Sequence, residues 1–159
     1  MASPTIDDDR LWQFLEIQDY LWIVIVLVCA ILPFISAIRN KTSISLGVVL
    51  SLLLVSFIQY ALSLFTGEIF SFNPIDIFSL IPALSLEPSH FHRLVTSGWI
   101  HADWIHVLGN ILVIALVGVP LEQRLGAKRW MIVYLLGMLG GNVAWIWTHP
   151  DSWNPAVGA

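Results

Sequence analysis

The segment GWIHADWIHVLGNILVIALVGV, residues 98–119, decides how the rest of this chain is interpreted. Its second half is apolar enough for a membrane interior, whereas its first half carries His101, Asp103, His106 and Asn110. Polar groups in an apolar helix cost free energy unless they find hydrogen-bond partners, and ionisable residues there are rare. The segment therefore predicts a membrane-spanning helix with a polar site at one end.

The composition of the whole chain is typical of a membrane protein. Of the 159 residues, 57% are hydrophobic and only 11% are charged, whereas about a quarter of the residues in soluble domains are charged. The mean hydropathy is +0.80, and the net charge of -4 offers no basic surface for nucleic acid. We therefore predict an all-α, polytopic helical membrane protein whose surroundings are the lipid bilayer.

Four stretches are long and apolar enough to cross a bilayer, because its hydrocarbon core of about 30 Å needs about 20 helical residues. The first, residues 20–38, lacks a basic leading region and a convincing cleavage site, so we expect a retained anchor and not a removed signal peptide. Pro33 lies inside it and is expected to kink the helix without ending it. The other predicted spans are residues 44–65, 102–121 and 128–147.

The basic residues predict how the spans are oriented. They lie in two short connections, with Arg39 and Lys41 in the first and Arg124, Lys128 and Arg129 in the last. Such connections stay in the cytoplasm, so we expect the polar end of the third span on the extracytoplasmic side, at the cell membrane. The connection over residues 66–101 is too apolar for a free linker and is expected to lie in the membrane interface as short helices.

The polar end of the third span is compatible with several chemistries. His106 and Asn110 are four residues apart, so on a helix they share one face about 6 Å apart along the axis, and His101 can fold over them. They could simply bond to neighbouring helices. A metal site would draw on His90 and His92 as well, but the H-E-x-x-H pattern of zinc proteases is absent. A haem held by two histidines would need a second intramembrane histidine. In an oxyanion site, side-chain N–H groups would stabilise the negative charge that develops on a carbonyl oxygen.

The stretches HADWIHVLGN, GVPLEQRLGAKRW and GMLGGN together resemble the rhomboid family of intramembrane serine proteases, over residues 93–159. Paired histidines, the H-x-x-x-N spacing and a Glu-x-Arg-x-Gly turn about a dozen residues later form a specific combination. The resemblance implies that His106 and Asn110 stabilise the oxyanion in the catalytic site and that His101 lies beside the same cavity. It implies no cofactor and no metal.

The resemblance also implies residues with a structural role. Glu122, Arg124 and Gly126 match a turn at the cytoplasmic end, which is either an ordinary basic loop or a lock between spans. Arg93 stands where the family's loop often has Trp-Arg, although the preceding residue here is His92.

Small residues in the fourth span predict helix packing. Gly137 and Gly141 are spaced G-x-x-x-G, which allows helices to approach closely. Asn142 is expected to form hydrogen bonds within the bundle.

The resemblance also carries an expectation about the nucleophile. In the family, NPAVGA continues as Ser-Gly, so Gly158 and Ala159 match the residues that precede the nucleophilic serine, and the base is a histidine on a later span. We expect the 159 residues alone to be inactive, as the N-terminal part of a serine endopeptidase that cuts membrane-anchored proteins in or near their transmembrane helix. Residues 1–43 would be an N-terminal tail and an extra span, and residues 44–159 the N-terminal part of a rhomboid-like membrane domain.

Two other functions are compatible with the same residues. A catalytically inactive rhomboid-like protein would bind membrane helices without cutting them. A small proton-coupled transporter would use His101 and His106 as a proton relay. The serine and histidine expected downstream discriminate the protease from both.

Overall fold

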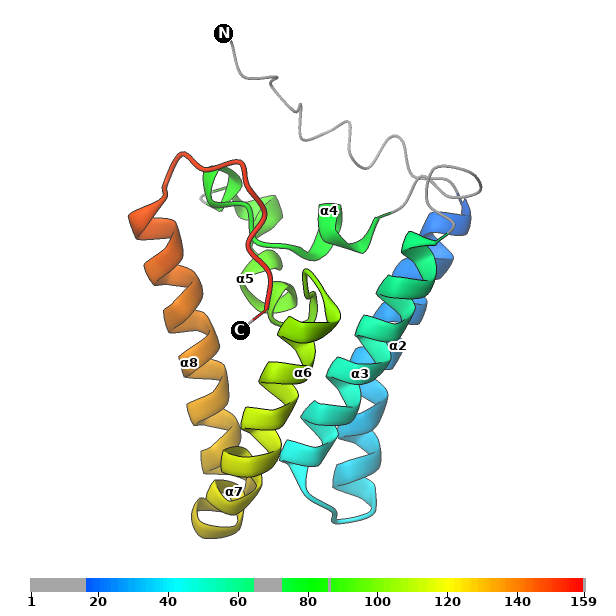
Figure 1. Cartoon of the computed structure of the whole chain (residues 1–159), viewed down its shortest axis with the longest axis vertical. Coiled ribbons are helices and arrows are strands. Elements are labelled where there is room, and N and C mark those ends of the chain that lie inside the picture. The colour runs from blue at the N-terminus through cyan, green and yellow to red at the C-terminus, as the bar shows by residue number, and fades with distance from the viewer. Residues whose placement is uncertain (1–16, 65–72, 86, 159) are drawn as a thin grey trace, which may run out of the picture.

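The computed structural model describes residues 17–64, 73–85 and 87–158, apart from the side chain of Gln18. Long helices cross the molecule (Figure 1): α2 (Ile17–Arg39), α3 (Ile44–Ser63), α8 (Ala127–Thr148), and a continuous run of α6 (Trp104–Val113), η4 (Ile114–Gly118) and α7 (Val119–Leu125). Short helices connect α3 to α6: α4 (Pro74–Phe78), η1 (Pro82–Leu84), η2 (Pro88–His90), α5 (Arg93–Thr96) and η3 (Ser97–Trp99). The only β-pairing among the described residues is one bridge between Leu80 and Ala156.

Four helical segments have the length and apolarity to cross a membrane: Asp19–Arg39, Ile44–Ser63, Trp104–Leu125 and Ala127–Thr148. They coincide with the four predicted spans within a few residues, so the helical multi-pass architecture is confirmed. The helix α2 continues through Pro33, as expected. The end of the second predicted span at residue 65, and residues 66–72 of the long connection, lie outside the described residues.

The two basic connections lie at the same end of the molecule, at the bottom of Figure 1. Both are tight turns with a left-handed residue, Lys41 with φ 53° in the first and Gly126 with φ 80° in the second. Glycine adopts this conformation without steric cost, which accounts for Gly126. The short helices of the long connection and the end of the described chain gather in the opposite half of the molecule, with α5 and the chain end near its mid-height (Figure 1).

Glu122 fastens α7 to the start of α3. Its Oε2 atom accepts hydrogen bonds from Ser43 Oγ and Ser45 Oγ, both at 2.6 Å, and from Ser45 N at 2.8 Å. Its Oε1 atom accepts from Ile44 N at 2.8 Å. The first N–H groups of a helix have no intrahelical partner and carry partial positive charge, so a buried carboxylate is stabilised there. This geometry fits a lock between spans.

The third span contains a widened turn, because Ile114–Gly118 wind as a π-helix. Pro120 lies two residues beyond this turn, and a proline has no N–H to donate while its ring crowds the carbonyl four residues earlier. A π-turn is one way for a helix to accommodate such a break. A Cβ atom at Gly118 would lie 3.2 Å from Trp130 Cζ2, so glycine lets α8 pack closely against this turn.

Arg93 holds the long connection together from inside. It is buried, and it donates from Nη1 to the Ser79 carbonyl at 2.8 Å, from Nη2 to the Asp76 carbonyl at 2.7 Å, and from Nε to His90 Nδ1 at 2.8 Å. Burial raises the pKa of the Asp76 carboxyl above its usual range, and the Arg93 charge partly offsets this rise. One guanidinium thus links α4, η2 and α5, since its planar fork reaches several acceptors at once.

His92 stands in place of the tryptophan expected before Arg93, and it links helices by hydrogen bonding. Its Nδ1 atom lies 3.0 Å from the Ser89 carbonyl, and its Nε2 atom lies 3.0 Å from the Ile77 carbonyl. The imidazole therefore joins η2 to the end of α4.

Candidate active site

Asp103 positions the polar residues at the start of α6. It is the N-cap, with extended backbone, and its Oδ1 atom accepts from His106 N at 2.8 Å. An aspartate in this position satisfies one of the helix's unpaired N–H groups and fixes where the helix begins. His106 consequently lies in the first turn and Asn110 one turn later, so both project from one face.

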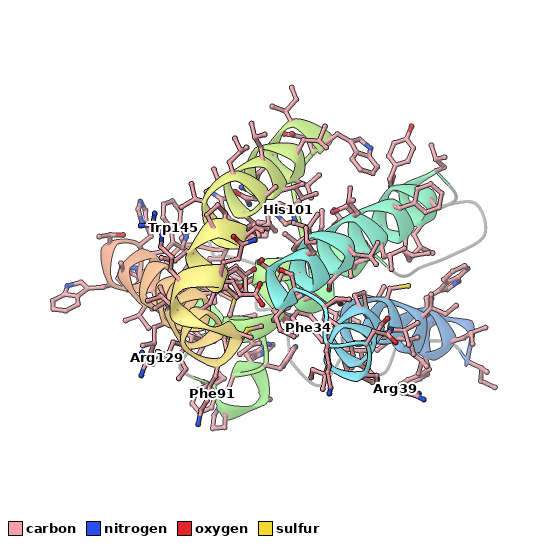
Figure 2. All side chains as sticks on the ribbon, turned by 90° about the horizontal axis from the view of Figure 1, so that it is seen from below. Phe34, Arg39, Phe91, His101, Arg129 and Trp145 are labelled. Carbon is pink, nitrogen blue, oxygen red and sulfur yellow. The ribbon has the colours of Figure 1, made fainter. Side chains whose placement is uncertain are left out.

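His101 packs over this face from the preceding loop and lies between α6 and α3 (Figure 2). Its Nε2 atom is 3.0 Å from Asn110 Nδ2, and its ring centroid is 5.0 Å from that of His106 in an edge-to-face arrangement. Its Nδ1 atom is 3.3 Å from the Trp99 carbonyl. Because an amide nitrogen only donates, His101 Nε2 accepts from Asn110, and Nδ1 carries the proton that Trp99 accepts.

The charge state of His101 agrees with this tautomer. Burial lowers the pKa of His101 to about 4, and the neighbouring His106 acts in the same direction, against opposing effects of the Trp99 carbonyl and Asp103. The imidazole is therefore neutral at pH 7 and keeps the lone pair that accepts from Asn110. A neutral His101 orients the Asn110 amide without adding a charge beside it.

Gln59, on α3, is part of the site although the sequence analysis did not single it out. Its Nε2 atom donates to the His101 carbonyl at 2.5 Å, and its Oε1 atom accepts from His101 N at 3.2 Å. This double contact fixes the backbone of His101 against the second span. The sequence contains a signal that could have identified Gln59. It is the single amide side chain in the predicted span 44–65, and a polar group at membrane depth is costly unless it has a hydrogen-bonding or functional role.

The end of the described chain returns to the histidines. After α8 the segment folds back between α8 and α6 (Figure 1), held by the bridge between Leu80 and Ala156 and by a 3.0 Å hydrogen bond from Gly158 N to the Ser97 carbonyl. Gly158 has φ 76°, and a Cβ atom there would lie 2.6 Å from His106 Nε2. Only glycine fits, so its backbone lies directly against His106; Ala159 is outside the described residues.

Two pockets flank this cluster. One, of about 150 Å³, lies between α3 and α6 and is lined by polar residues that include His101, Gln59, Asp103 and Ser56. The Oγ atom of Ser56 is buried and has no hydrogen-bond partner among the described residues, which suits an ordered water. The other, of about 520 Å³, lies between α8 and the returning segment and reaches Gly158.

The remaining predicted residues lie away from the cluster or support it indirectly. Asn142 donates from Nδ2 to the Leu94 carbonyl at 2.8 Å and to Ser97 Oγ at 3.0 Å, which joins α8 to the long connection. Arg124 is exposed at the basic end. Gly137 and Gly141 have open space where a Cβ atom would stand, so within residues 17–64, 73–85 and 87–158 no helix approaches them closely, and they line the larger pocket. The G-x-x-x-G packing stays a prediction.

The described residues also bear on the metal interpretation. They contain no group of three or more His, Cys, Asp or Glu placed to hold a metal ion. His90 and His92 stack on each other with ring centroids 6.3 Å apart and bond within the long connection. The polar side chains at the start of α6 are arranged around hydrogen bonds and a glycine backbone.

The fold and this cluster define a class, namely a helical multi-pass membrane protein with a buried polar site at one end of a span. Residues 88–159 match the family model of the Rhomboid domain. This part of the chain is therefore of the rhomboid family.

Curated relatives agree with the family. The chain is 41% identical to RHOMBOID-like protein 2 of Arabidopsis thaliana over 32% of this chain and 16% of the relative. It is 34% identical to RHOMBOID-like protein 1 of the same plant, over 53% of this chain and 25% of the relative. It is 33% identical to Rhomboid-like protease 3 of Toxoplasma gondii, over 42% of this chain and 25% of the relative. The chain thus spans a quarter or less of the length of these relatives. No solved structure matches it.

Proposed function

We propose that the protein is an intramembrane serine endopeptidase of the rhomboid type, and that this chain supplies the oxyanion side of its active site. The observation that carries the proposal is the convergence of three polar residues: Asn110 bonds to His101, and the rings of His101 and His106 lie against the position of Gly158. Residues 1–43 would add a tail and an extra span to a rhomboid-like membrane domain that begins at residue 44.

Asn110 and His106 have the chemistry that an oxyanion needs. Asn110 Nδ2 carries two hydrogens, and one is donated to His101, so the second is free to bind a carbonyl oxygen that becomes negative. His106 lies beside it with its imidazole against the glycine backbone. Donors fixed in advance at such a position stabilise the transition state because no reorganisation is needed during the reaction.

The nucleophile is expected close to this pair. The family resemblance implies a serine directly after Ala159, and two residues of backbone reach at most about 7 Å from Gly158. A serine hydroxyl is a weak nucleophile until a base removes its proton, and the resemblance assigns that base to a histidine on a later span. Neither residue lies within residues 1–159.

The reaction would follow the acyl-enzyme route. The serine oxygen attacks the scissile carbonyl while the histidine base accepts its proton, and His106, Asn110 and nearby backbone N–H groups bind the oxyanion. Collapse of the intermediate expels the amine, which takes the proton from the histidine, and water then hydrolyses the ester. The polar pocket beside His101 offers a place for that water.

The substrates would be proteins with a transmembrane anchor, cut in or near the spanning helix. The basic connections favour a cytoplasmic location for the opposite end of the molecule, which would put the site on the extracytoplasmic side of the cell membrane. No cofactor enters the proposed chemistry.

The direct test is labelling of the full-length protein, in detergent or vesicles, with a fluorophosphonate that reacts with activated serines. We expect labelling and cleavage of a membrane-anchored reporter, and we expect both to disappear when the serine predicted after Ala159 is replaced by alanine. Labelling that survives this replacement would contradict the assignment. Reporter binding without labelling or cleavage would instead indicate an inactive rhomboid-like protein, and proton-coupled uptake without cleavage would indicate a transporter.

A further inference from the structure

Asn142 is a buried amide in the second half of α8. It is the single amide side chain among Ala127–Thr148, and it is only 9% exposed. A polar group at membrane depth costs free energy unless it is hydrogen-bonded. Its amide hydrogens are not donated to the polar cluster at the start of α6 but to the long connection, so the reason for its position lies there.

Both hydrogens of the Asn142 amide have an acceptor in the long connection. The Nδ2 atom lies 2.8 Å from the Leu94 carbonyl oxygen and 3.0 Å from Ser97 Oγ, and an amide nitrogen carries two hydrogens. Ser97 is 2% exposed, so its hydroxyl meets this amide away from water. The two hydrogen bonds therefore fix the start of η3 against α8.

Ser97 also holds the returning segment, through its backbone. Its carbonyl oxygen accepts from Ile100 N at 3.2 Å, within the turn of η3, and from Gly158 N at 3.0 Å. Among the described residues, this second bond is the one hydrogen bond of the chain beyond Ala156, which pairs with Leu80 in the bridge. One residue thus contacts α8 by its side chain and the last described residue by its carbonyl.

The position of Gly158 leaves little room for displacement. A Cβ atom there would lie 2.6 Å from His106 Nε2 and 3.2 Å from His101 Cδ2, so the backbone packs directly against both rings. A shift of the Ser97 carbonyl would move this backbone relative to the rings. In an active site, a misplacement of about 1 Å can lower the rate about 100-fold. The bond to Ser97 is therefore suited to set the spacing between the returning segment and the donors of α6.

We propose that Ser97 and Asn142 are positioning residues of the active site. The Asn142 amide fixes the Ser97 hydroxyl, and the Ser97 carbonyl fixes the backbone of Gly158. The nucleophile expected after Ala159 is thereby held at a set distance from His106. Both residues act through the backbone and not on a reacting atom. This inference rests on the proposed function, because the spacing affects catalysis only if a nucleophile follows.

The test measures kcat and KM separately for variants of the full-length protein that cleave a membrane-anchored reporter. Asn142→Leu keeps the size of the side chain but cannot donate, and Ser97→Ala removes the hydroxyl acceptor while leaving the carbonyl. Each should lower kcat by about 10- to 100-fold and change KM by less than about two-fold, because the nucleophile is displaced and substrate contacts are kept. Thr148→Val is the matched control and should retain full kcat, since its hydroxyl bonds only within α8 and to the adjacent His149.

Two further measurements separate positioning from a general loosening of the fold. The double variant should have a kcat within about three-fold of the lower single variant, because both residues act through one hydrogen bond and such effects do not add. Hydrogen exchange at the Gly158 amide should become roughly 10-fold faster in either single variant. Exchange at the Ala156 amide, which donates to the Leu80 carbonyl at 2.7 Å, should stay unchanged. A residue with only a structural role would speed exchange at both amides.

The proposal can be overturned in three ways. Unchanged kcat in both single variants, folded by circular dichroism and beside an active wild type, would mean that these bonds do not position the nucleophile. Losses that multiply in the double variant, or equally faster exchange at Gly158 and Ala156, would mean that Ser97 and Asn142 only stabilise the fold. A wild type that neither cleaves the reporter nor reacts with the fluorophosphonate would contradict the proposed function itself, and the positioning role with it.

Discussion

The two ends of the third span, Trp104–Leu125, place polar groups in apolar surroundings in different ways. At the basic end a single carboxylate, Glu122, accepts four hydrogen bonds, and each of its oxygens is used. At the other end Asn110 donates one amide hydrogen to His101, and the ring of His106 lies against the backbone of Gly158. A closed network holds helices together, whereas an open one would be available to a substrate of the proposed protease.

The closed network should give the largest loss of stability when it is broken. Glu122→Ala leaves two hydroxyl and two backbone donors without their acceptor, and we expect a loss of about 3 kcal/mol in the free energy of unfolding. Unfolding of the full-length protein in detergent, followed by circular dichroism, measures it. The neighbouring exposed Gln123→Ala, with its side chain outside the network, is the control and should change stability by less than about 0.5 kcal/mol. Similar values for the two variants would mean that Glu122 is not a lock.

The open network should respond the other way, with a loss of activity and little loss of stability. His106→Ala and Asn110→Ala should each lower kcat by about 100- to 1000-fold, as expected when one oxyanion donor is removed. Cleavage of a membrane-anchored reporter by the full-length protein checks this. Leu108→Ala, an exposed residue of the same helix, serves as the control. Full activity in Asn110→Ala would exclude it from the oxyanion site.

Two glycines differ in the space that a Cβ atom would find: at Gly158 it would collide with a side chain, and at Gly137 it would meet no atom within 4 Å. Gly158→Ala should weaken the docking of the returning segment by about 2 kcal/mol, because the backbone has positive φ and the methyl group would collide with His106. Hydrogen exchange at the amides of Gly158 and its neighbours measures this loss, because weaker docking speeds the exchange. Gly137→Ala should stabilise α8 by up to about 1 kcal/mol if its space is open. A marked destabilisation there would instead support the G-x-x-x-G packing interpretation.

The smallest expected effect is a pH dependence that comes from His101 at the open end. The pKa of His101 is about 4 when folded, against 6.5 for an ordinary histidine, so between these pH values the unfolded chain binds more protons. Stability is therefore lost as the pH falls from 6.5 towards 4, by about 1 kcal/mol between pH 7 and 5.5. Unfolding curves of the wild type and of His101→Gln, which cannot titrate, should differ in slope over this range. Parallel curves would contradict a neutral buried His101.

The sequence predicted the elements whose signals are local. Uninterrupted apolar runs defined the four spans, and the four-residue spacing of His106 and Asn110 placed them on one face because a helix repeats every 3.6 residues. Contacts that depend on distant segments could not be derived in this way. The hydrogen bonds between Gln59 and His101 join residues 42 positions apart, and those of Glu122 join residues 77 to 79 positions apart.

The same limit applies to the returning segment. Nothing in the local pattern of residues 149–158 indicates that Gly158 comes back to His106, because that path depends on pairing with Leu80 and Ser97 in the long connection. Periodicity describes one element at a time, whereas a site is a relation between several.

The π-turn at Ile114–Gly118 sets the angular phase between the two ends of the third span. In a regular helix the 12 residues from Asn110 to Glu122 would rotate the side chain by about 100° each, which leaves the two about 120° apart around the axis. A π-turn absorbs one extra residue and reduces that offset to about 20°. Asn110 and Glu122 then share one azimuth. Straightening the π-turn with all twelve residues kept would turn the lock and the site about 120° apart, whereas deleting one residue within 114–118 would leave a regular helix with the same offset of about 20°.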